Sequence, residues 1–210
     1  MTRGFLRLQA PRPVARLLLA HGAGAPMDSD FMNALAAALA QQGISTLRFE
    51  FPYMAARRSG GGKRPPDRTP VLLDCWRKVF VQAGEEDSTL PLLVGGKSMG
   101  GRMASMVADE LGAAGLCCYG YPFHPPGRSD KLRTEHLVSL VTPALILQGT
   151  RDPFGKPETV TELILSAQLR VHWLDDGDHD FKPRKTAGRS HEELIDEAAV
   201  ETRKLVDAFL

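Results

Sequence analysis

Short apolar segments alternate with amphipathic ones from about residue 14 to the C-terminus. The apolar runs carry few polar residues, and the segments between them repeat apolar residues every three or four positions. Strands that are apolar on both sides are typical of a parallel sheet covered by helices on each face, because neither face meets water. The pattern predicts one α/β domain over residues 1–210. The expected strands are Ala15–Ala20, Ser45–Phe49, Leu90–Val94, Gly115–Tyr119, Ala144–Leu147 and Arg170–Leu174.

Five amphipathic stripes predict the helices. They are marked by Phe31, Leu35 and Leu39, by Leu72, Trp76 and Val79, by Met103, Met106 and Val107, by Val160, Leu163 and Ile164, and by Leu194, Ala198 and Leu205. Ser190 and Glu193 fit the capping box that starts a helix.

Two stretches are predicted to be loops, the basic one at 57–68 and the proline-rich one at 121–128. Both follow predicted strands, where loops of an open α/β sheet surround the ligand crevice.

Charge and cysteine content narrow the class of protein. With 26 basic and 25 acidic residues the net charge is +1, which gives no overall field to attract nucleic acid or an anionic membrane, so neither is expected as a partner. No apolar run is long enough to span a membrane, and arginines interrupt the N-terminal apolar stretch before a signal peptide can form. The three cysteines are not spaced as a disulfide framework, which favours free thiols and a cytoplasmic protein.

The segment Gly96-Lys-Ser98-Met-Gly100 is the strongest chemical signal. It has the form G-x-S-x-G between a predicted strand and a predicted helix, which is typical of a sharp turn that exposes a nucleophilic serine. The same segment resembles the end of a phosphate-binding loop. That loop needs a glycine at position 91, which is Pro91, so the nucleophile interpretation is favoured.

A nucleophilic serine needs a base and a carboxylate that orients the base. In α/β-hydrolases, which carry G-x-S-x-G at such a turn, the acid and then the histidine come later in the chain. Asp152 follows a predicted strand, and His179 lies in a loop after the next one. His172 lies within a strand and His191 starts a helix, so we predict Ser98, Asp152 and His179 as the catalytic triad.

The acidic loop around His179 also suggests a metal site. No second histidine lies at ligand spacing, and the aspartates do not follow a calcium-loop pattern. We therefore expect a solvated turn there, with no metal and no cofactor.

Backbone N–H groups must hold the oxyanion of a tetrahedral intermediate. Met99, directly after the serine, is one predicted donor. The second is predicted in the loop after the first long strand, where Ala23 is favoured and Gly24 is the alternative. We expect His21 to shape that loop.

The segments His21-Gly-Ala-Gly, Gly-Lys-Ser98-Met-Gly-Gly, Gly-Thr-Arg-Asp152 and Gly-Asp-His179 resemble the α/β-hydrolase superfamily, in the same order. The chain is most similar to its small lidless branch, near the dienelactone hydrolases. The resemblance implies an α/β-hydrolase fold with a mostly parallel sheet of about six or seven strands, helices on both faces and a minimal lid at about residues 121–136. Dienelactone hydrolases use a cysteine where this chain has Ser98, so their substrate is not implied.

We expect a serine hydrolase of carboxylesterase or thioesterase type that acts on a small soluble ester, thioester or lactone. Arg57 and Arg58 either recognise an anionic group of the substrate or lie in a solvated loop. Tyr53, Tyr121 and Phe123 either line an acyl pocket or serve packing. The branch also resembles chromatin-complex subunits without established catalysis, so the alternative is a catalytically silent binding or assembly module. The sequence specifies neither the acyl group nor the oligomeric state.

Overall fold

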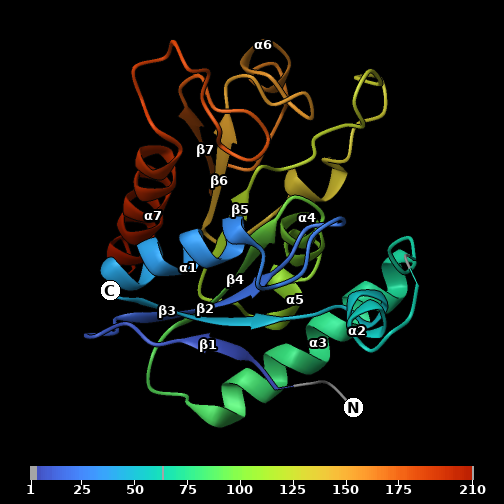
Figure 1. The fold of residues 1–210 in the computed structure, drawn as a ribbon, viewed down its shortest axis with the longest axis vertical. Coiled ribbons are helices and arrows are strands. Elements are labelled where there is room, and N and C mark those ends of the chain that lie inside the picture. Colours follow the sequence, from blue (N-terminus) through green and yellow to red (C-terminus); the bar gives the residue numbers. More distant parts are fainter. Residues whose placement is uncertain (1–3, 63, 210) are drawn as a thin grey trace.

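The computed structural model describes residues 4–62 and 64–209. Seven strands form one sheet in the order β1-β3-β2-β4-β5-β6-β7 (Figure 1). The edge strand β1 is antiparallel to β3, and all the other neighbouring strands are parallel. The strands are β1 Leu6–Leu8, β2 Ala15–Ala20, β3 Ile44–Phe49, β4 Leu92–Lys97, β5 Leu116–Tyr119, β6 Ala144–Gly149 and β7 Leu169–Leu174.

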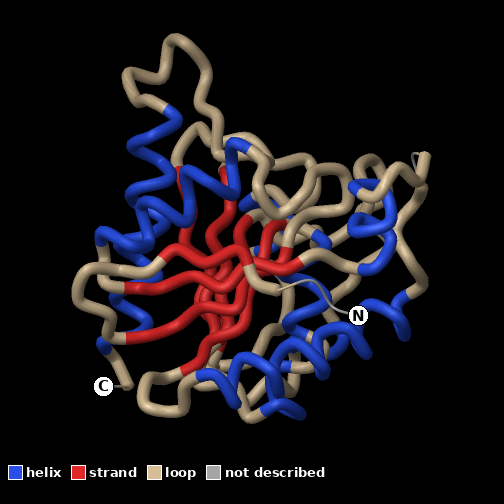
Figure 2. Tube along the Cα trace, turned by 60° about the horizontal axis from the view of Figure 1, so that its bottom comes forward, coloured by secondary structure: helices blue, strands red, loops and turns tan. Residues whose placement is uncertain are grey.

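Helices cover both faces of this sheet (Figure 2). Alternate residues of β2 pack on opposite sides, with Leu17 and Leu19 in the core beneath α1 and α7 and Leu18 in the core beneath α3 and α4. This arrangement explains the apolar strand pattern and confirms the predicted fold class. The helices are α1 Asp30–Gln41, α2 Pro52–Arg58, α3 Thr69–Glu86, α4 Met99–Ser105, α5 Ala108–Leu111, α6 Pro157–Val160 and α7 His191–Asp207.

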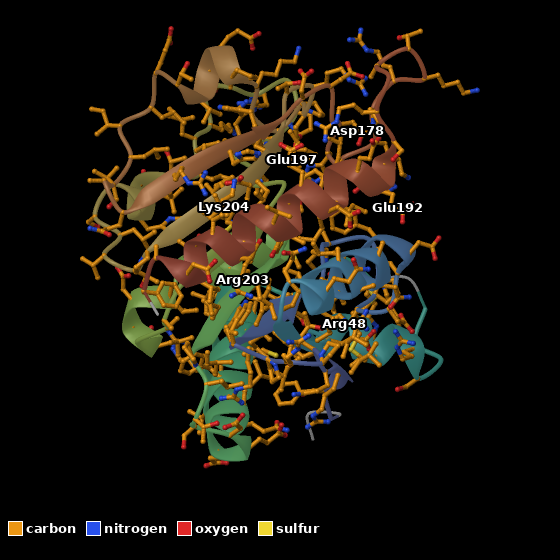
Figure 3. The ribbon with its side chains drawn as sticks, turned by 90° about the vertical axis from the view of Figure 1, so that its left-hand side faces the viewer. Arg48, Asp178, Glu192, Glu197, Arg203 and Lys204 are labelled. Atoms are coloured by element: carbon orange, nitrogen blue, oxygen red, sulfur yellow. The ribbon has the colours of Figure 1, made fainter. Side chains whose placement is uncertain are left out.

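The last helix packs along the C-terminal half of the sheet, and Figure 3 shows Glu197 and Lys204 along its length. Its N-terminus carries the predicted capping box of Ser190 and Glu193. On the side facing edge strand β7, Glu197 Oε1 lies 2.7 Å from Nε2 of His172. His172 therefore has a structural partner outside the predicted triad.

Several predicted elements need correction. Strand β1 was not expected, because a segment of three residues is too short to show a period. Arg57 and Arg58 end a short helix, α2, instead of lying in a loop. The helix expected through Ile164 is wrong: α6 stops at Val160, and Ile164 is 80% exposed. The run Thr159-Val160-Thr161 consists of β-branched residues, which disfavour continuation of a helix.

The connection between β5 and β6 holds a single 3₁₀ turn, Glu135–Leu137, among the described residues. A helical lid domain inserted at this point would need far more chain than residues 120–143 provide. The expected minimal lid is therefore confirmed.

Substitution by alanine is expected to change the stability in opposite directions at two glycines, one in β4 and one in α3. A Cβ at Gly95 of β4 would lie 2.3 Å from the Cys117 carbonyl oxygen of β5, whereas a Cβ at Gly84 in α3 would meet nothing within 4 Å. Gly95→Ala is expected to lower the free energy of unfolding by about 2 kcal/mol or more because backbone must move. The control Gly84→Ala is expected to raise it by about 0.5–1 kcal/mol. Urea denaturation measures both, and equal effects would contradict the packing at β4.

Candidate active site

Ser98 lies on a sharp turn between β4 and α4. Its φ is 50° and its ψ is −115°, a strained conformation for a residue with a side chain. The turn packs against the end of β2: a Cβ at Gly96 would lie 2.7 Å from the Ala20 carbonyl oxygen, and one at Gly100 would lie 2.6 Å from that of His21. These contacts explain why glycines stand two residues before and two after the serine.

Asp152 and His179 form a direct pair. Asp152 follows β6 and is fully buried, and its Oδ2 lies 2.7 Å from Nδ1 of His179. His179 comes from the loop after β7 and is partly exposed, with 22% of its side chain accessible. Because Nδ1 is bound to the carboxylate, Nε2 is the ring nitrogen left to face a nucleophile.

Two further groups hold the Asp152 carboxylate. The buried side chain of Gln148 donates from Nε2 to Oδ2 at 3.0 Å, and the Phe154 backbone N–H donates to Oδ1 at 2.9 Å. Gln148 also bonds the Tyr121 backbone through both ends of its amide. Gln148 was not among the predicted site residues, although a polar residue that continues the apolar run of β6 was a usable signal.

The loop that carries His179 is shaped by its own aspartates. Asp176 accepts from Nε of Arg184 at 2.7 Å and from its backbone N–H at 2.6 Å, and Asp178 Oδ1 accepts from the backbone N–H groups of Asp180 and Lys182. The Arg184 hydrogen bonds hold the pKa of Asp176 below its usual value. The carboxylates of Asp176 and Asp178 therefore form hydrogen bonds within the loop, so the prediction of a merely solvated turn is wrong for these two residues.

Strand β4 and the histidine loop meet through Lys97, the residue before the serine. Lys97 Nζ donates to the His179 carbonyl oxygen at 2.7 Å, while the Ser98 backbone N–H donates to the Tyr119 carbonyl of β5 at 3.0 Å. The parallel sheet thus brings the serine turn and the Asp152–His179 pair to the same edge, at the carboxyl ends of the strands.

The predicted oxyanion donors border Ser98. Met99 is the first residue of α4, so its N–H has no acceptor within the helix. On the other side, a Cβ at Gly22 would lie 3.8 Å from the Ser98 Cβ, which places the loop containing Ala23 beside the serine.

Two buried side chains hold that loop. The Tyr53 hydroxyl donates to the Ala23 carbonyl at 2.9 Å, and burial raises the pKa of Tyr53 to about 12, so it stays a donor at neutral pH. His21 Nδ1 lies 2.6 Å from the Gly22 carbonyl, while its Nε2 accepts from the Phe51 N–H. His21 is therefore the Nδ1-protonated neutral tautomer.

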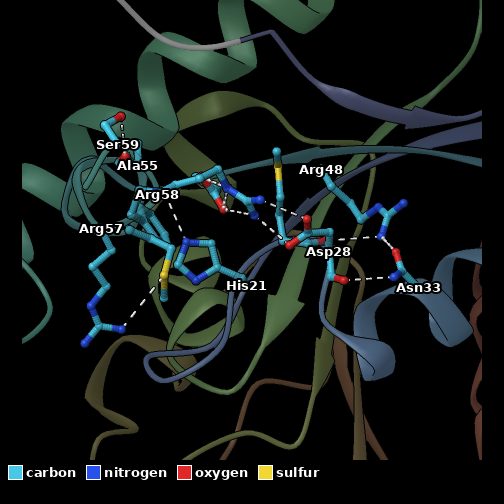
Figure 4. A network of polar contacts seen from close by, with 12 residues as sticks. His21, Asp28, Asn33, Arg48, Ala55, Arg57, Arg58 and Ser59 are labelled. Carbon is cyan, nitrogen blue, oxygen red and sulfur yellow. Dashed lines mark hydrogen bonds and ion pairs between the residues drawn. The ribbon is translucent and has the colours of Figure 1, made fainter. Parts of the chain in front are cut away.

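The two arginines of α2 have different surroundings (Figure 4). Arg58 forms ion pairs of 2.6 Å with both Asp28 and Glu50, which balance its charge within the protein. Arg57 donates to the Arg64 carbonyl and lies over the Tyr53 ring, 5.5 Å from its centre. Contact of either arginine with a substrate stays a prediction.

The remaining aromatic candidates are fully buried. Tyr121 and Phe123 pack edge to face with their ring centres 4.9 Å apart, and the Tyr121 hydroxyl donates to the Arg133 carbonyl at 2.8 Å. Both lie in the segment after β5 that stands in place of a lid. Their place in an acyl pocket is likewise still a prediction.

The buried His21 predicts a pH effect on stability. Burial lowers the pKa of His21 below 6.5, so the unfolded chain binds a proton more readily than the folded one. The stability contributed by neutral His21 is complete above pH 6.5 and is lost as the pH falls through the folded-state value, with a slope of at most about 1.4 kcal/mol per pH unit. His21→Gln is expected to flatten the fall in unfolding free energy between pH 7 and 5, measured by urea denaturation. An unchanged slope would contradict a neutral His21.

Comparison with known proteins agrees with the fold. A family model described as an alpha/beta hydrolase domain matches residues 13–207. No curated protein sequence matches the chain. Among the described residues, no helix combines the length and apolar character needed to cross a membrane.

Similar solved structures cover nearly the whole chain. An alpha-beta serine hydrolase homologue from Coxiella burnetii is 20% identical, with a TM-score of 0.67 over 100% of this chain and 99% of its own. A serine hydrolase without a lid from Xanthomonas campestris is also 20% identical, with a TM-score of 0.70 over 97% and 94%. A dienelactone hydrolase from Anabaena variabilis is 17% identical, with a TM-score of 0.71 over 97% and 90%. Fold and family model together show that the chain belongs to the alpha/beta hydrolase family.

Proposed function

We propose that the protein is a serine hydrolase that cleaves a small soluble ester, thioester or lactone by acyl transfer. The observation that carries the proposal is the 2.7 Å contact between buried Asp152 and His179, at the sheet edge that also holds the strained Ser98 turn. A buried carboxylate that fixes a histidine tautomer beside a serine turn is the arrangement used to activate a hydroxyl.

The mechanism follows from the position of each group. Ser98 Oγ attacks the substrate carbonyl while His179 Nε2 takes its proton, and Asp152 stabilises the imidazolium that forms. The N–H groups of Met99 and Ala23 bind the oxyanion. His179 then returns the proton to the leaving alcohol or thiol. Water repeats the sequence to release the acid and restore Ser98.

The short β5–β6 connection supports a small substrate. Lipases shield long acyl chains with an inserted lid, and residues 120–143 provide one 3₁₀ turn in its place. Est1E from Butyrivibrio proteoclasticus, for which a structure with ferulic acid is known, is 16% identical over 97% of this chain with a TM-score of 0.67, which makes esters of aromatic acids such as ferulic acid sensible first substrates.

Replacement of the nucleophile is the direct test. Ser98→Ala is expected to lower kcat for p-nitrophenyl acetate by about 10⁴-fold or more, because no hydroxyl remains to be acylated. Ser105→Ala, which removes the hydroxyl of a buried serine seven residues further on at the end of α4, is the control and is expected to keep most of the activity. Activity that survives Ser98→Ala would overturn the proposal. Inactivity of the folded wild-type protein on a panel of short esters, thioesters and lactones would favour the silent binding module.

Replacement of Asp152 tests the predicted acid of the triad through the steady-state constants. Asp152→Asn keeps the shape of the side chain but removes the charge that stabilises the imidazolium, so kcat is expected to fall by about 10³- to 10⁴-fold with little change in KM. Steady-state kinetics measures both constants. An unchanged kcat would remove Asp152 from the triad.

A further inference from the structure

Lys97 is a buried cation that the acyl-transfer mechanism leaves unused. It is the last residue of β4, directly before Ser98, and only 7% of it is exposed. Lysine is almost never buried this far without partners, because its charge loses hydration. Its place between the nucleophile and the histidine loop therefore requires a physical explanation.

The ammonium group has three partners. Nζ donates to the His179 carbonyl oxygen at 2.7 Å, lies 3.3 Å from Oδ1 of Asp180, and stands 5.3 Å from the centre of the Phe31 ring of α1. Among the described residues, the contacts to His179 and Asp180 are the only hydrogen bond and ion pair between β4 and residues 175–185. Two strands, β5 and β6, lie between β4 and β7, the strand that precedes that loop.

The ammonium also lies close to the catalytic pair. A Cβ at Gly120 would lie 3.2 Å from Lys97 Nζ and 3.2 Å from His179 Nδ1. The distance between Lys97 Nζ and His179 Nδ1 is therefore at most the sum of these two distances. Gly120 has a φ of +70° at this crowded point, which favours glycine.

The charge of Lys97 depends on the carboxylates that face it. Burial lowers the pKa of Lys97, while Asp180, Asp152 and Asp178 act in the opposite direction. His179 is the remaining titratable neighbour, and α1 presents only the Phe31 ring. Lys97 therefore loses its proton at a lower pH than an exposed lysine does.

We propose that charged Lys97 is a positioning residue that fixes the His179 backbone relative to Ser98 and so aligns the base with the nucleophile. The role rests on the proposed hydrolase function. Because the backbone carbonyl of His179 is held rather than its ring, the imidazole stays free to exchange a proton with Ser98. Misplacement of a catalytic group by about 1 Å lowers rates by about 100-fold.

Labelling kinetics test this role. Lys97→Met keeps the length and burial of the side chain but removes the charge, and it is expected to slow fluorophosphonate labelling of Ser98 by about 10- to 100-fold at pH 7.5. Lys78→Met, at an exposed lysine paired with Asp74 on α3, is the matched control and is expected to label at the wild-type rate. A folded Lys97→Met protein that labels at the wild-type rate would overturn the proposal.

A pH profile separates positioning from simple packing. The wild-type labelling rate is expected to fall with rising pH as Lys97 loses its proton, at a lower pH than an exposed lysine would. Asp180→Asn, which removes one supporting carboxylate, is expected to move that fall to lower pH, and Lys97→Met is expected to abolish it. The same alkaline fall in all three proteins would contradict the role of the charge.

A readout that does not need catalysis keeps the two proposals distinguishable. Hydrogen exchange of residues 175–185 is expected to be faster in Lys97→Met than in the wild type, with the rest of the chain unchanged. An absence of wild-type labelling on Ser98 would refute the hydrolase function, whereas unchanged exchange in Lys97→Met would refute the role of Lys97.

Discussion

The close packing of the β4–α4 turn against the end of β2 determines where Ser98, the predicted nucleophile, can lie. A Cβ at Gly96 or Gly100 would lie within 2.7 Å of backbone atoms of Ala20 or His21. The backbone of the turn can therefore pack against β2 only where these two residues are glycines. This contact holds Ser98 in its positive-φ conformation and starts α4 beneath it, with the Met99 N–H left without a helical acceptor. The same contact brings the loop after β2 alongside the serine.

The remainder of the site is supported from behind by buried polar side chains. Gln148 and the Phe154 N–H hold Asp152, which in turn orients His179. Tyr53 and His21 hold the loop of Ala23, the predicted oxyanion donor, from the opposite side. Gln148 lies in β6 and His21 directly follows β2, while Tyr53 and Phe154 lie four and five residues beyond β3 and β6. The strands therefore set much of the spacing between the predicted catalytic groups.

Most of the fold was accessible from the sequence because strands buried on both faces give continuous apolar runs. The triad candidates were accessible because glycine spacing and chain order constrain them. The contacts of Lys97 and Arg58 could not be predicted from the sequence. Lys97 meets His179 across 82 residues and Arg58 meets Asp28 across 30, and such pairings depend on the strand order. Helix α6 stops early because local β-branched residues outweigh the apolar period.

The most direct measurement is the intact mass of the protein after incubation with a fluorophosphonate, followed by peptide mapping of the adduct. We expect one label per chain, located on Ser98 and absent in His179→Ala. A folded wild-type protein that takes no label, or one whose label lies on another residue, would contradict an activated serine at the β4–α4 turn.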